Sequence, residues 1–500
     1  MNSPKTKAPT MSGPFSLEKI TFYTKMIHMQ NRVYIKDLKD HVGQEVIIKG
    51  WIQIRRDQGK MTFFDFRDAS GIVQGVVLPG SAVTEIAKET RPEWVVAVTG
   101  KVNARPEKMV KVGVQNGDIE IEVLGIEVLN KAETPAFDIL SDTREVNEET
   151  RLTHRYLDLR SERLQKNIRM RHKVQNFVRG LLDTQNFTEI ETPIFTRSTP
   201  EGARDYVVPS RIHPGKFYAL PQSPQQYKQL LMAGGMERYY QFARCMRDED
   251  LRGDRQPEFT QLDMEMSFAS EEDIMNVTEN LLIKIVTELY PEKKIQAIPF
   301  PRIPYKEAME KYGNDRPDIR ENKEDANLLA FCWVVDFPFF ERTDKSDNPQ
   351  AMGEWTFTHN PFSLCKPEYL SNVMEKKDIA DVLAAQYDIV LNGYEIGGGS
   401  VRAHDPEILK NILGILGYAP EKIESDYGHM LRALGSGTPP HGGIAWGFDR
   451  LMMLLQNEPN IREVIAFPKT REGRDPMMDS PSEISDKQLA ELNIKVVKKD

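Results

Sequence analysis

Residues 239–268 constrain the fold of this chain more than any other segment, because they read as two strands joined by a polar loop. In the first run, a period of two places Arg247 and Glu249 on one face of a strand. The loop, residues 250–258, is rich in arginine and glutamine. The pattern therefore predicts a hairpin with a polar tip.

The second run divides its side chains between two faces. One face is polar and the other apolar: Gln261, Asp263 and Glu265 against Leu262, Met264, Met266 and Phe268. A charged hairpin at a sheet edge is usually solvated, but an apolar second face favours a place inside a sheet. Carboxylates next to fixed guanidinium charge suit a magnesium-bound polyphosphate beside an ammonium-bearing substrate.

The composition limits the other possibilities. The chain has 500 residues, 66 basic against 75 acidic side chains and a net charge of −9, so any nucleic-acid surface must be local. No apolar run approaches the about 20 residues of a membrane span, so we expect no membrane partner. Three separated cysteines, Cys245, Cys332 and Cys365, argue against zinc and fit a reducing cytoplasm. Residues 1–28 lack the apolar core of a secretory signal, and Met29 is an alternative start.

Short strands broken by glycine fill residues 33–130. Five such strands, with a helical piece at residues 81–90, predict a small closed barrel of the OB type. OB barrels bind single-stranded nucleic acid by stacking bases on exposed aromatic side chains beside basic ones. Because alternation places Phe64 and Phe66 on one face and Phe63 on the other, Phe63 is the candidate for stacking.

Two segments resemble one family. RDED…RQPEFTQLDME closely resembles motif 2 of the class II aminoacyl-tRNA synthetases, in the form used by aspartyl-tRNA synthetases. GWIQIRRD…FFDFRD…GIVQ resembles the anticodon-binding domain of that family, which implies that Phe63 stacks on an anticodon base and that Gln74, with Arg56, reads base edges. The resemblance implies the α+β class: an OB-fold barrel and a class II catalytic domain whose antiparallel sheet is flanked by helices. We expect an extension at 1–28, the barrel at 29–135, a hinge at 136–163 and the catalytic domain at 164–500.

Residues 151–173 hold eight basic and two acidic side chains, which predict either a solvated helix face or contacts with the tRNA backbone. RLTHRYLDLR looks like the hinge of the family. An amphipathic helix at about residues 164–185 resembles motif 1, which forms the dimer interface of class II enzymes, so we expect a homodimer. Asn186 replaces the usual glycine and also tolerates a positive φ.

The resemblance also implies an amino-acid site. The residues that correspond to Glu201, Ser223 and Gln225 lie near the ammonium group of L-aspartate in the family. The whole set expected to bind aspartate is Glu201, Ser223, Gln225, Lys228, Arg247, Asp263, His359 and Arg402. Lys228 lies near the side chain of the substrate in the family, and Arg402 clamps its carboxylate.

Glu395 and Arg402 have opposite parity, so on an unbroken strand they would face apart. Glycines 397–399 permit a bulge that would let both side chains reach one ligand. The family equivalents of Asp388 and Glu395 hold Mg²⁺ and ATP.

GIAWGFDR resembles motif 3, whose arginine, here Arg450, reaches the far phosphate of ATP. The resemblance implies catalytic roles for Arg247, Glu249 and Arg450. It implies an ATP site formed by Arg247, Asp248, Glu249, Gln256, Phe259, Glu395, Gly447, Phe448, Asp449 and Arg450.

Two places depart from the bacterial pattern of the family. About a dozen polar residues around 321–330 stand where an insertion domain is usual. FTHNPF has Asn360 in place of a second histidine, so a neutral amide replaces a possible positive charge.

We therefore expect a cytoplasmic, dimeric enzyme that uses ATP and Mg²⁺ to form aspartyl-adenylate and passes the aspartyl group to tRNA(Asp). A synthetase for asparagine or lysine is a close alternative. An adenylate-forming paralogue that serves a small amine would lack the barrel, and a catalytically inactive RNA-binding module would have lost motif residues.

The choice of tRNA depends on the turn at residues 55–59, which contains Gln58. In the family, leucine at this position is typical of strict enzymes and histidine of relaxed ones. Because an amide both donates and accepts hydrogen bonds, we expect relaxed specificity that includes tRNA(Asn). Strict charging of tRNA(Asp) is the alternative.

Overall fold

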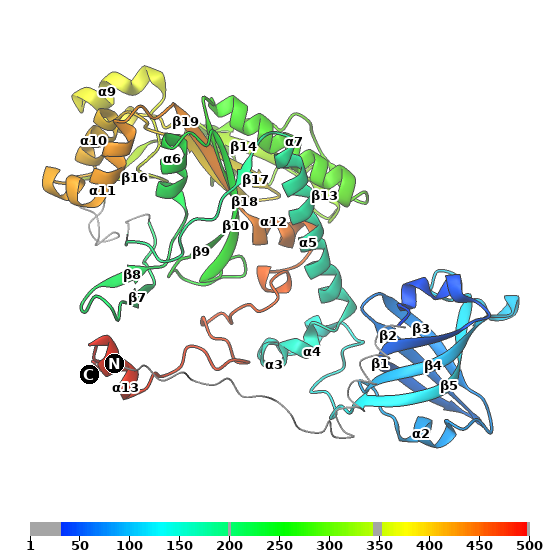
Figure 1. Ribbon diagram of the computed structural model, residues 1–500. Helices are drawn as coiled ribbons and strands as arrows, with labels where there is room; N and C mark the ends of the chain where they lie inside the picture. Colours follow the sequence, from blue (N-terminus) through cyan, green and yellow to red (C-terminus); the bar gives the residue numbers. More distant parts are fainter. Residues whose placement is uncertain (1–31, 199–201, 344–352, 498–500) are drawn as a thin grey trace, which may run out of the picture. The chain divides into compact units, whose positions relative to one another are not determined.

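The structure is a computed structural model that describes residues 32–198, 202–343 and 353–497. The chain folds into two compact units, Met1–Asp138 and Ile139–Asp500 (Figure 1). Each unit is considered by itself below.

The first unit is a closed five-stranded barrel in the order β1-β2-β3-β5-β4, which confirms the expected OB fold. Its elements are η2 Ile35–His41, β1 Glu45–Gln58, β2 Met61–Asp68, β3 Gly71–Val77, α2 Thr84–Glu89, β4 Val95–Ala104 and β5 Ile119–Asn130. Alternation along β2 sends Phe64 and Phe66 into the barrel core, where both are fully buried, and leaves Phe63 outside and half-buried.

The second unit is built on an eight-stranded sheet in the order β12-β14-β17-β18-β19-β10-β9-β6. Its strands are β6 Thr188–Glu189, β9 Arg238–Met246, β10 Glu258–Ser267, β12 Arg302–Pro304, β14 Phe331–Val335, β17 Gln386–Leu391, β18 Tyr394–Val401 and β19 His441–Gly447. The central pairs are antiparallel, and only the outermost pairs, β12 with β14 and β6 with β9, are parallel.

Helices α5 (Glu162–Asp183), α7 (Glu271–Leu289) and α12 (Phe448–Leu455) share one hydrophobic core with one face of this sheet (Figure 1). Helices α10 (Pro406–Ile415) and α11 (Pro420–Leu434) build a second core, and α6 (Gln225–Ala233) contacts both α11 and β10. The remaining elements of this unit are η4 Thr143–Glu145, α3 Glu148–Thr153, α4 Arg155–Asp158, β7 Val207–Pro209, β8 Phe217–Ala219, β11 Lys294–Ile295, α8 Tyr305–Tyr312, β13 Leu328–Leu329, β15 Phe340–Arg342, β16 Trp355–Phe357, η5 Pro367–Tyr369, α9 Leu370–Glu375, η6 Ile379–Asp381, η7 Ile461–Glu463 and α13 Asp486–Leu492.

The hairpin of β9 and β10 exists, but two expectations about its ends were wrong. β9 stops at Met246, so Arg247 and Glu249 belong to the loop and not to a strand face. Phe268 is 71% exposed and has a φ of 56°, because β10 ends at Ser267 and the chain turns there. The expected positive φ at Asn186 is confirmed at 62°.

Half of the basic side chains at residues 151–173 form ion pairs inside the unit, namely Arg151, Arg155, Arg163 and Arg171, whereas Lys166, Arg169 and Lys173 are exposed. Arg151 donates to both carboxylate oxygens of Glu463 at 3.0 and 2.9 Å, and Arg155 donates to Asp158 at 2.6 Å. Both arginines are buried, so neither a solvated face nor a phosphate contact describes them. They fix α3 and α4 to η7 of the second unit.

The connection between α8 and β13 contains only residues 313–327, so no domain is inserted there. This confirms the short connection that the sequence predicts.

A bulge in β18 aligns the side chains that follow it. Val390 pairs with Glu395 and Ile389 pairs with Gly397, which leaves Ile396 without a partner residue across the strands. The extra residue brings Glu395 to the same face of the sheet as Gly398 and Arg402. The expected bulge is confirmed, one residue before the three glycines.

Gly399 is the tightest point of this strand, because a Cβ there would lie 2.1 Å from the carbonyl oxygen of Gly443 and 2.8 Å from Tyr387. We expect Gly399→Ala to lower the free energy of unfolding by about 3 kcal/mol or more. Gly180→Ala in α5 is the control, since nothing lies within 4 Å of its added Cβ, and it should stabilise by up to about 1 kcal/mol. Urea unfolding measures both; equal stability of Gly399→Ala and the wild type would contradict the packing described.

Candidate active site

Four buried charges meet on the face of the sheet opposite α5, α7 and α12. Lys228 Nζ lies 2.6 Å from Asp263 Oδ1 and 3.1 Å from Glu265 Oε2. Arg402 donates from Nε and Nη2 to the two oxygens of Glu265, at 2.9 and 3.2 Å. None of the four residues is more than 2% exposed. We call this set, two cations and two carboxylates, the ion network.

The network sets the charge state of its carboxylates. Burial favours the neutral form of Glu265, but Arg402 and Lys228 outweigh it and lower its pKa to about 2. Burial raises the pKa of Asp263 against the opposing effect of Lys228. Hydrogen-bond donors remain on both cations. Lys228 has three N–H groups and uses two, and Arg402 uses four of five, two on Glu265, one on Ser400 at 2.7 Å and one on the carbonyl of Gly443 at 3.4 Å.

Asp388 and Glu395 lie farther along the same face. Burial, with Glu395 nearby, raises the pKa of Asp388 well above its usual range. Asp388 Oδ1 is buried and has no hydrogen-bond partner among the described residues. A Cβ on Gly398 would come within 2.6 Å of that oxygen and 2.9 Å of His359 Nε2, so glycine keeps the space before the carboxylate open.

His359 is exposed to solvent in this opening, yet the surrounding protein lowers its pKa by desolvation. Glu395 acts in the opposite direction, and Arg402, Arg247 and Lys228 lower the pKa further. His359 thus borders both the ion network and the two carboxylates. The neighbouring Asn360 accepts from the backbone N–H of Phe362 at 2.8 Å, so its amide oxygen stabilises a local turn.

No group of three or more His, Cys, Asp or Glu side chains within the described ranges is arranged to hold a metal ion by itself. Two carboxylates, one of which has an oxygen without a hydrogen-bond partner among the described residues, nevertheless fit a Mg²⁺ site. Mg²⁺ often takes one or two carboxylates from the protein, and phosphate oxygens and water complete its coordination shell. Asp388 and Glu395 are therefore the residues that could hold the metal.

The loop between β9 and β10 carries the expected phosphate-binding side chains. The guanidinium of Arg247 lies 5.2 Å from the ring centre of Phe259, a cation–π distance, and Arg247 Nε donates to the carbonyl of Gln222 at 3.3 Å. Glu249 pairs with Arg255 at 3.2 Å, and Asp248 lies 3.4 Å from Arg204. Arg247 is held in place by its neighbours while remaining half-buried.

Arg450, near the start of α12, donates to the carbonyl of Glu395 and to Asp254 at 3.0 Å. Arg450 therefore links the start of α12 to β18, the strand that carries Glu395. Asp254 also lines an open cavity of about 550 Å³ together with Arg316 and Lys323.

Three residues expected near ATP make other contacts. Gln256 binds the backbone of Lys469 with both ends of its amide, at 2.7 and 3.2 Å. Phe448 lies in the hydrophobic core, and Asp449 accepts from the backbone N–H of Thr260 at 2.8 Å and from Arg171. These contacts fix the three side chains to the surrounding structure, and their roles near ATP stay predictions; Gly447 ends β19 and caps the start of α12.

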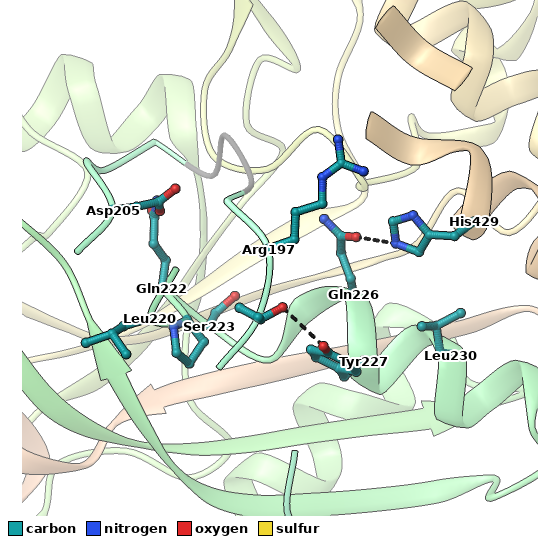
Figure 2. A pocket seen from close by; sticks show the side chains of 11 residues that line it. Arg197, Asp205, Leu220, Gln222, Ser223, Gln226, Tyr227, Leu230 and His429 are labelled. Carbon is teal, nitrogen blue, oxygen red and sulfur yellow. Dashed lines mark hydrogen bonds between the residues drawn. The ribbon is translucent and has the colours of Figure 1, made fainter. Parts of the chain in front are cut away.

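Ser223 and Gln225 stand at the start of α6, beside the ion network, whereas Glu201 lies outside the described residues. A cavity of about 270 Å³ opens on the other side of this helix start and is lined by Ser223, Gln226, Tyr227 and His429 (Figure 2). Gln226 and His429 point toward one another across it, with Oε1 and Nε2 2.8 Å apart.

Several residues of this candidate site were not predicted from the sequence. Glu265 was placed on the polar face but not paired with Arg402, and Asp254, Gln229 and His441 were not considered. Only the spacing of four between Gln225 and Gln229, which places them on one helix face, could have pointed to one of them.

The candidate anticodon residues share one outer face of the barrel. Arg56 pairs across the strands with Phe63, and Gln74 pairs with Asp65, so all four side chains project to the same side. Arg56 donates two hydrogen bonds of 2.9 Å to Asp65, and Gln74 lies 3.4 Å from Lys111 Nζ. Gln58 is exposed at the end of β1.

Comparison with known proteins agrees with this geometry. Residues 147–471 match the family described as tRNA synthetases class II (D, K and N), and residues 46–129 match the OB-fold nucleic acid binding domain. The aspartate–tRNA(Asp/Asn) ligase of Rubrobacter xylanophilus is 38% identical, over 91% of this chain and 95% of that protein. The aspartate–tRNA ligase of Macrococcus caseolyticus is also 38% identical, over 92% and 97%.

Solved structures agree as well. The asparaginyl-tRNA synthetase of Pyrococcus horikoshii with asparaginyl-adenylate has a TM-score of 0.70 at 25% identity and covers 88% of this chain and 99% of that one. An aspartyl-tRNA synthetase of Entamoeba histolytica has a TM-score of 0.69 at 23% identity, over 93% and 97%. Fold and site thus define a class II aminoacyl-tRNA synthetase with an OB-fold domain. Within that class, the chain belongs to the aspartate–tRNA ligases.

The alignment with the Rubrobacter protein extends over 578 positions although it includes only 91% of these 500 residues. More than a hundred positions of that relative therefore have no counterpart here, which agrees with the short connection after α8.

Among the described helices, none is long and apolar enough to cross a membrane.

The pairing of Glu265 with two buried cations leads to a stability prediction. We expect Glu265→Gln to lower the free energy of unfolding by about 3–5 kcal/mol, because Arg402 loses its partner inside the protein. A carboxylate whose pKa falls from 4.5 to about 2 on folding stabilises above pH 4.5, and this stability is lost as the pH falls toward 2. The wild type should therefore lose more stability than the variant over that range.

Glu272→Gln is the matched control, because Glu272 pairs with Arg302 on the surface and its loss should cost less than about 1 kcal/mol. Denaturant unfolding at several pH values measures all three proteins. Equal losses for the two variants would contradict the buried pairing.

Proposed function

We propose that this protein activates L-aspartate with ATP and transfers the aspartyl group to the 3′ end of tRNA(Asp), and also of tRNA(Asn). The observation that carries the proposal is the ion network, which offers two spare donors to a ligand on the sheet face that also presents Arg247 and Asp388. The 38% identity to aspartate–tRNA ligases over nine-tenths of the chain supports the same activity.

The spare donors would favour aspartate over asparagine. Unpaired positive charge is not the reason, because Glu265 and Asp263 already neutralise both cations. One N–H of Lys228 and one of Arg402 remain, and both require an acceptor. A carboxylate supplies two acceptor oxygens, whereas the amide of asparagine must turn its NH₂ group toward one of the donors.

The adenylate forms when an oxygen of the α-carboxylate attacks the α-phosphorus of ATP and pyrophosphate leaves. In this step Arg247 would hold the α-phosphate, and Arg450 the γ-phosphate, while Phe259 would stack on the adenine. Glu249 would contact the adenosine. Catalysis would therefore come from orientation and from fixed positive charge at the developing charge on the phosphates.

Mg²⁺ would be held by Asp388 and Glu395, and when bound it supplies positive charge to the phosphate oxygens. The raised pKa of Asp388 agrees with a carboxylate that lacks its cationic partner. Both side chains reach one face because of the bulge at Ile396.

Pyrophosphate exchange with aspartate, asparagine and lysine tests the amino acid directly. We expect aspartate to be preferred over asparagine on the order of 10⁴-fold. Arg402→Leu should abolish the aspartate-dependent exchange, and ATP binding by calorimetry serves as the control for folding. Near-normal exchange in that variant, or comparable exchange with asparagine, would refute the site.

Charging of purified tRNA(Asp) and tRNA(Asn) tests the second half of the proposal. Relaxed specificity rests on Gln58, whose exposed amide can donate to or accept from either base edge. A preference above about a hundredfold for tRNA(Asp), which equals about 2.7 kcal/mol, would establish the strict alternative. Phe63→Ala should weaken charging of both tRNAs about 5- to 150-fold through the loss of one stacked base and leave pyrophosphate exchange unchanged.

A homodimer is part of the proposal. Large apolar side chains are exposed around the β7–β8 hairpin and the segment before it: Ile194, Phe195, Val207, Ile212, Phe217 and Tyr218. The rings of Phe195 and Tyr218 lie 5.4 Å apart, and exposed apolar side chains that gather in this way often mark an interface. Sedimentation at micromolar concentration should show twice the 57.3 kDa chain mass, and a single species at that mass would contradict a dimer.

A further inference from the structure

Behind the ion network, four groups form one chain of hydrogen bonds, and two of them, His441 and Gln229, have no part in the proposed reaction. His441 Nδ1 lies 2.8 Å from the carbonyl oxygen of Pro439, and His441 Nε2 lies 3.2 Å from Nε2 of Gln229. Gln229 Oε1 in turn accepts from Nε2 of Gln225 at 3.1 Å. The three side chains are 0%, 1% and 4% exposed for His441, Gln229 and Gln225.

The donors and acceptors in this series of hydrogen bonds follow from the carbonyl group of Pro439, where the series begins. A backbone carbonyl can only accept, so His441 must carry a proton on Nδ1. Burial lowers the pKa of His441, so the ring is neutral near pH 7 and Nε2 has a lone pair. The charged groups that face the ring are Glu265 on β10, which favours protonation, and Arg402, which opposes it together with His404.

The proton on Nδ1 therefore decides the orientation of two amides. Because His441 Nε2 accepts, Gln229 must present its NH₂ group to the histidine and its oxygen to Gln225. Gln225 then has to donate its own NH₂ group to that oxygen. Its Oε1 atom is the other end of the same amide, and it accepts no hydrogen bond from the residues that the structure describes.

Gln225 is one of the residues proposed above to lie near the ammonium group of the substrate. An ammonium group has three donors and no acceptor, so only the oxygen end of an amide can bind it. With the amide reversed, an NH₂ group would face the ammonium and the contact would become repulsive.

We propose that His441 and Gln229 are positioning residues that fix the amide of Gln225, so that its Oε1 atom faces the α-ammonium group of the amino acid. The proposal rests on the proposed aspartate activation. Neither residue touches the substrate; both act through Gln225, which lies four residues before Gln229 on α6. The specificity for an α-ammonium group then depends on a backbone carbonyl at Pro439.

Substitution of Gln229 or His441 tests this proposal. We expect Gln229→Leu and His441→Phe to raise the KM for aspartate in pyrophosphate exchange on the order of ten- to a hundredfold, with the KM for ATP near the wild-type value. Gln229→Glu still accepts from Gln225, and it can also accept from His441 once the ring takes up a second proton on Nε2, so its KM for aspartate should stay near that of the wild type. Thermal unfolding and ATP binding verify that each variant folds.

A rescue separates orientation from packing. In the Gln229→Leu background, Gln225→Glu should lower the KM for aspartate again, because a carboxylate accepts with either oxygen. In the wild-type background, the same Gln225→Glu change should raise it, because an oxygen would then face Oε1 of Gln229.

A change of the same sign in both backgrounds, or an unchanged KM in Gln229→Leu, would overturn the proposal. Wild-type protein without aspartate-dependent exchange would instead refute the aspartate activation on which it rests. The two failures are therefore distinguishable in one set of assays.

Discussion

The ion network of Lys228, Asp263, Glu265 and Arg402 joins α6, β10 and the end of β18 inside the protein, where isolated charges are most costly. Two cations and two carboxylates balance, so the site is electrically neutral before any ligand arrives. The selectivity that we propose for aspartate therefore rests on the remaining donors and not on unpaired charge. Removal of any member would disturb the fold and the ligand site together.

The pairing of β17, β18 and β19 places the polar side chains of this face next to one another. The bulge at Ile396 reverses the parity of β18, and the glycines that follow let β17 and β19 approach closely. As a result, Asp388, Glu395 and Arg402 share one side of the sheet with Asp263 and Glu265. The opposite side packs on α5, α7 and α12, so hydrophobic burial supplies the rigidity that the polar side requires.

Period-two alternation was sufficient to predict the polar face of β10, the inward Phe64 and Phe66, and the need for a bulge before Arg402. These features are local, because each depends on neighbours within one strand. The end of β9 and the exposure of Phe268 were predicted wrongly because pairing with β10 and β19, and not the alternation itself, decides where a strand stops.

Partners that are distant in the sequence could not be predicted from spacing. Glu265 and Arg402 are 137 residues apart, and Arg151 and Glu463 are 312 apart. For the same reason the basic residues around Arg151 suggested a nucleic-acid surface, although their carboxylate partners lie far along the chain. Gln256 and Asp449 show the same limit, since their partners Lys469 and Arg171 are also distant in the sequence.

The most direct test of this account is the binding of two non-hydrolysable adenylate analogues, aspartyl- and asparaginyl-sulfamoyl adenosine, measured by calorimetry. The two ligands differ only in a carboxylate against an amide, at the position that we propose to face Lys228 and Arg402. The account predicts that the aspartyl analogue binds at least about a hundredfold more tightly, which corresponds to about 2.7 kcal/mol. Equal affinities, or tighter binding of the asparaginyl analogue, would contradict it.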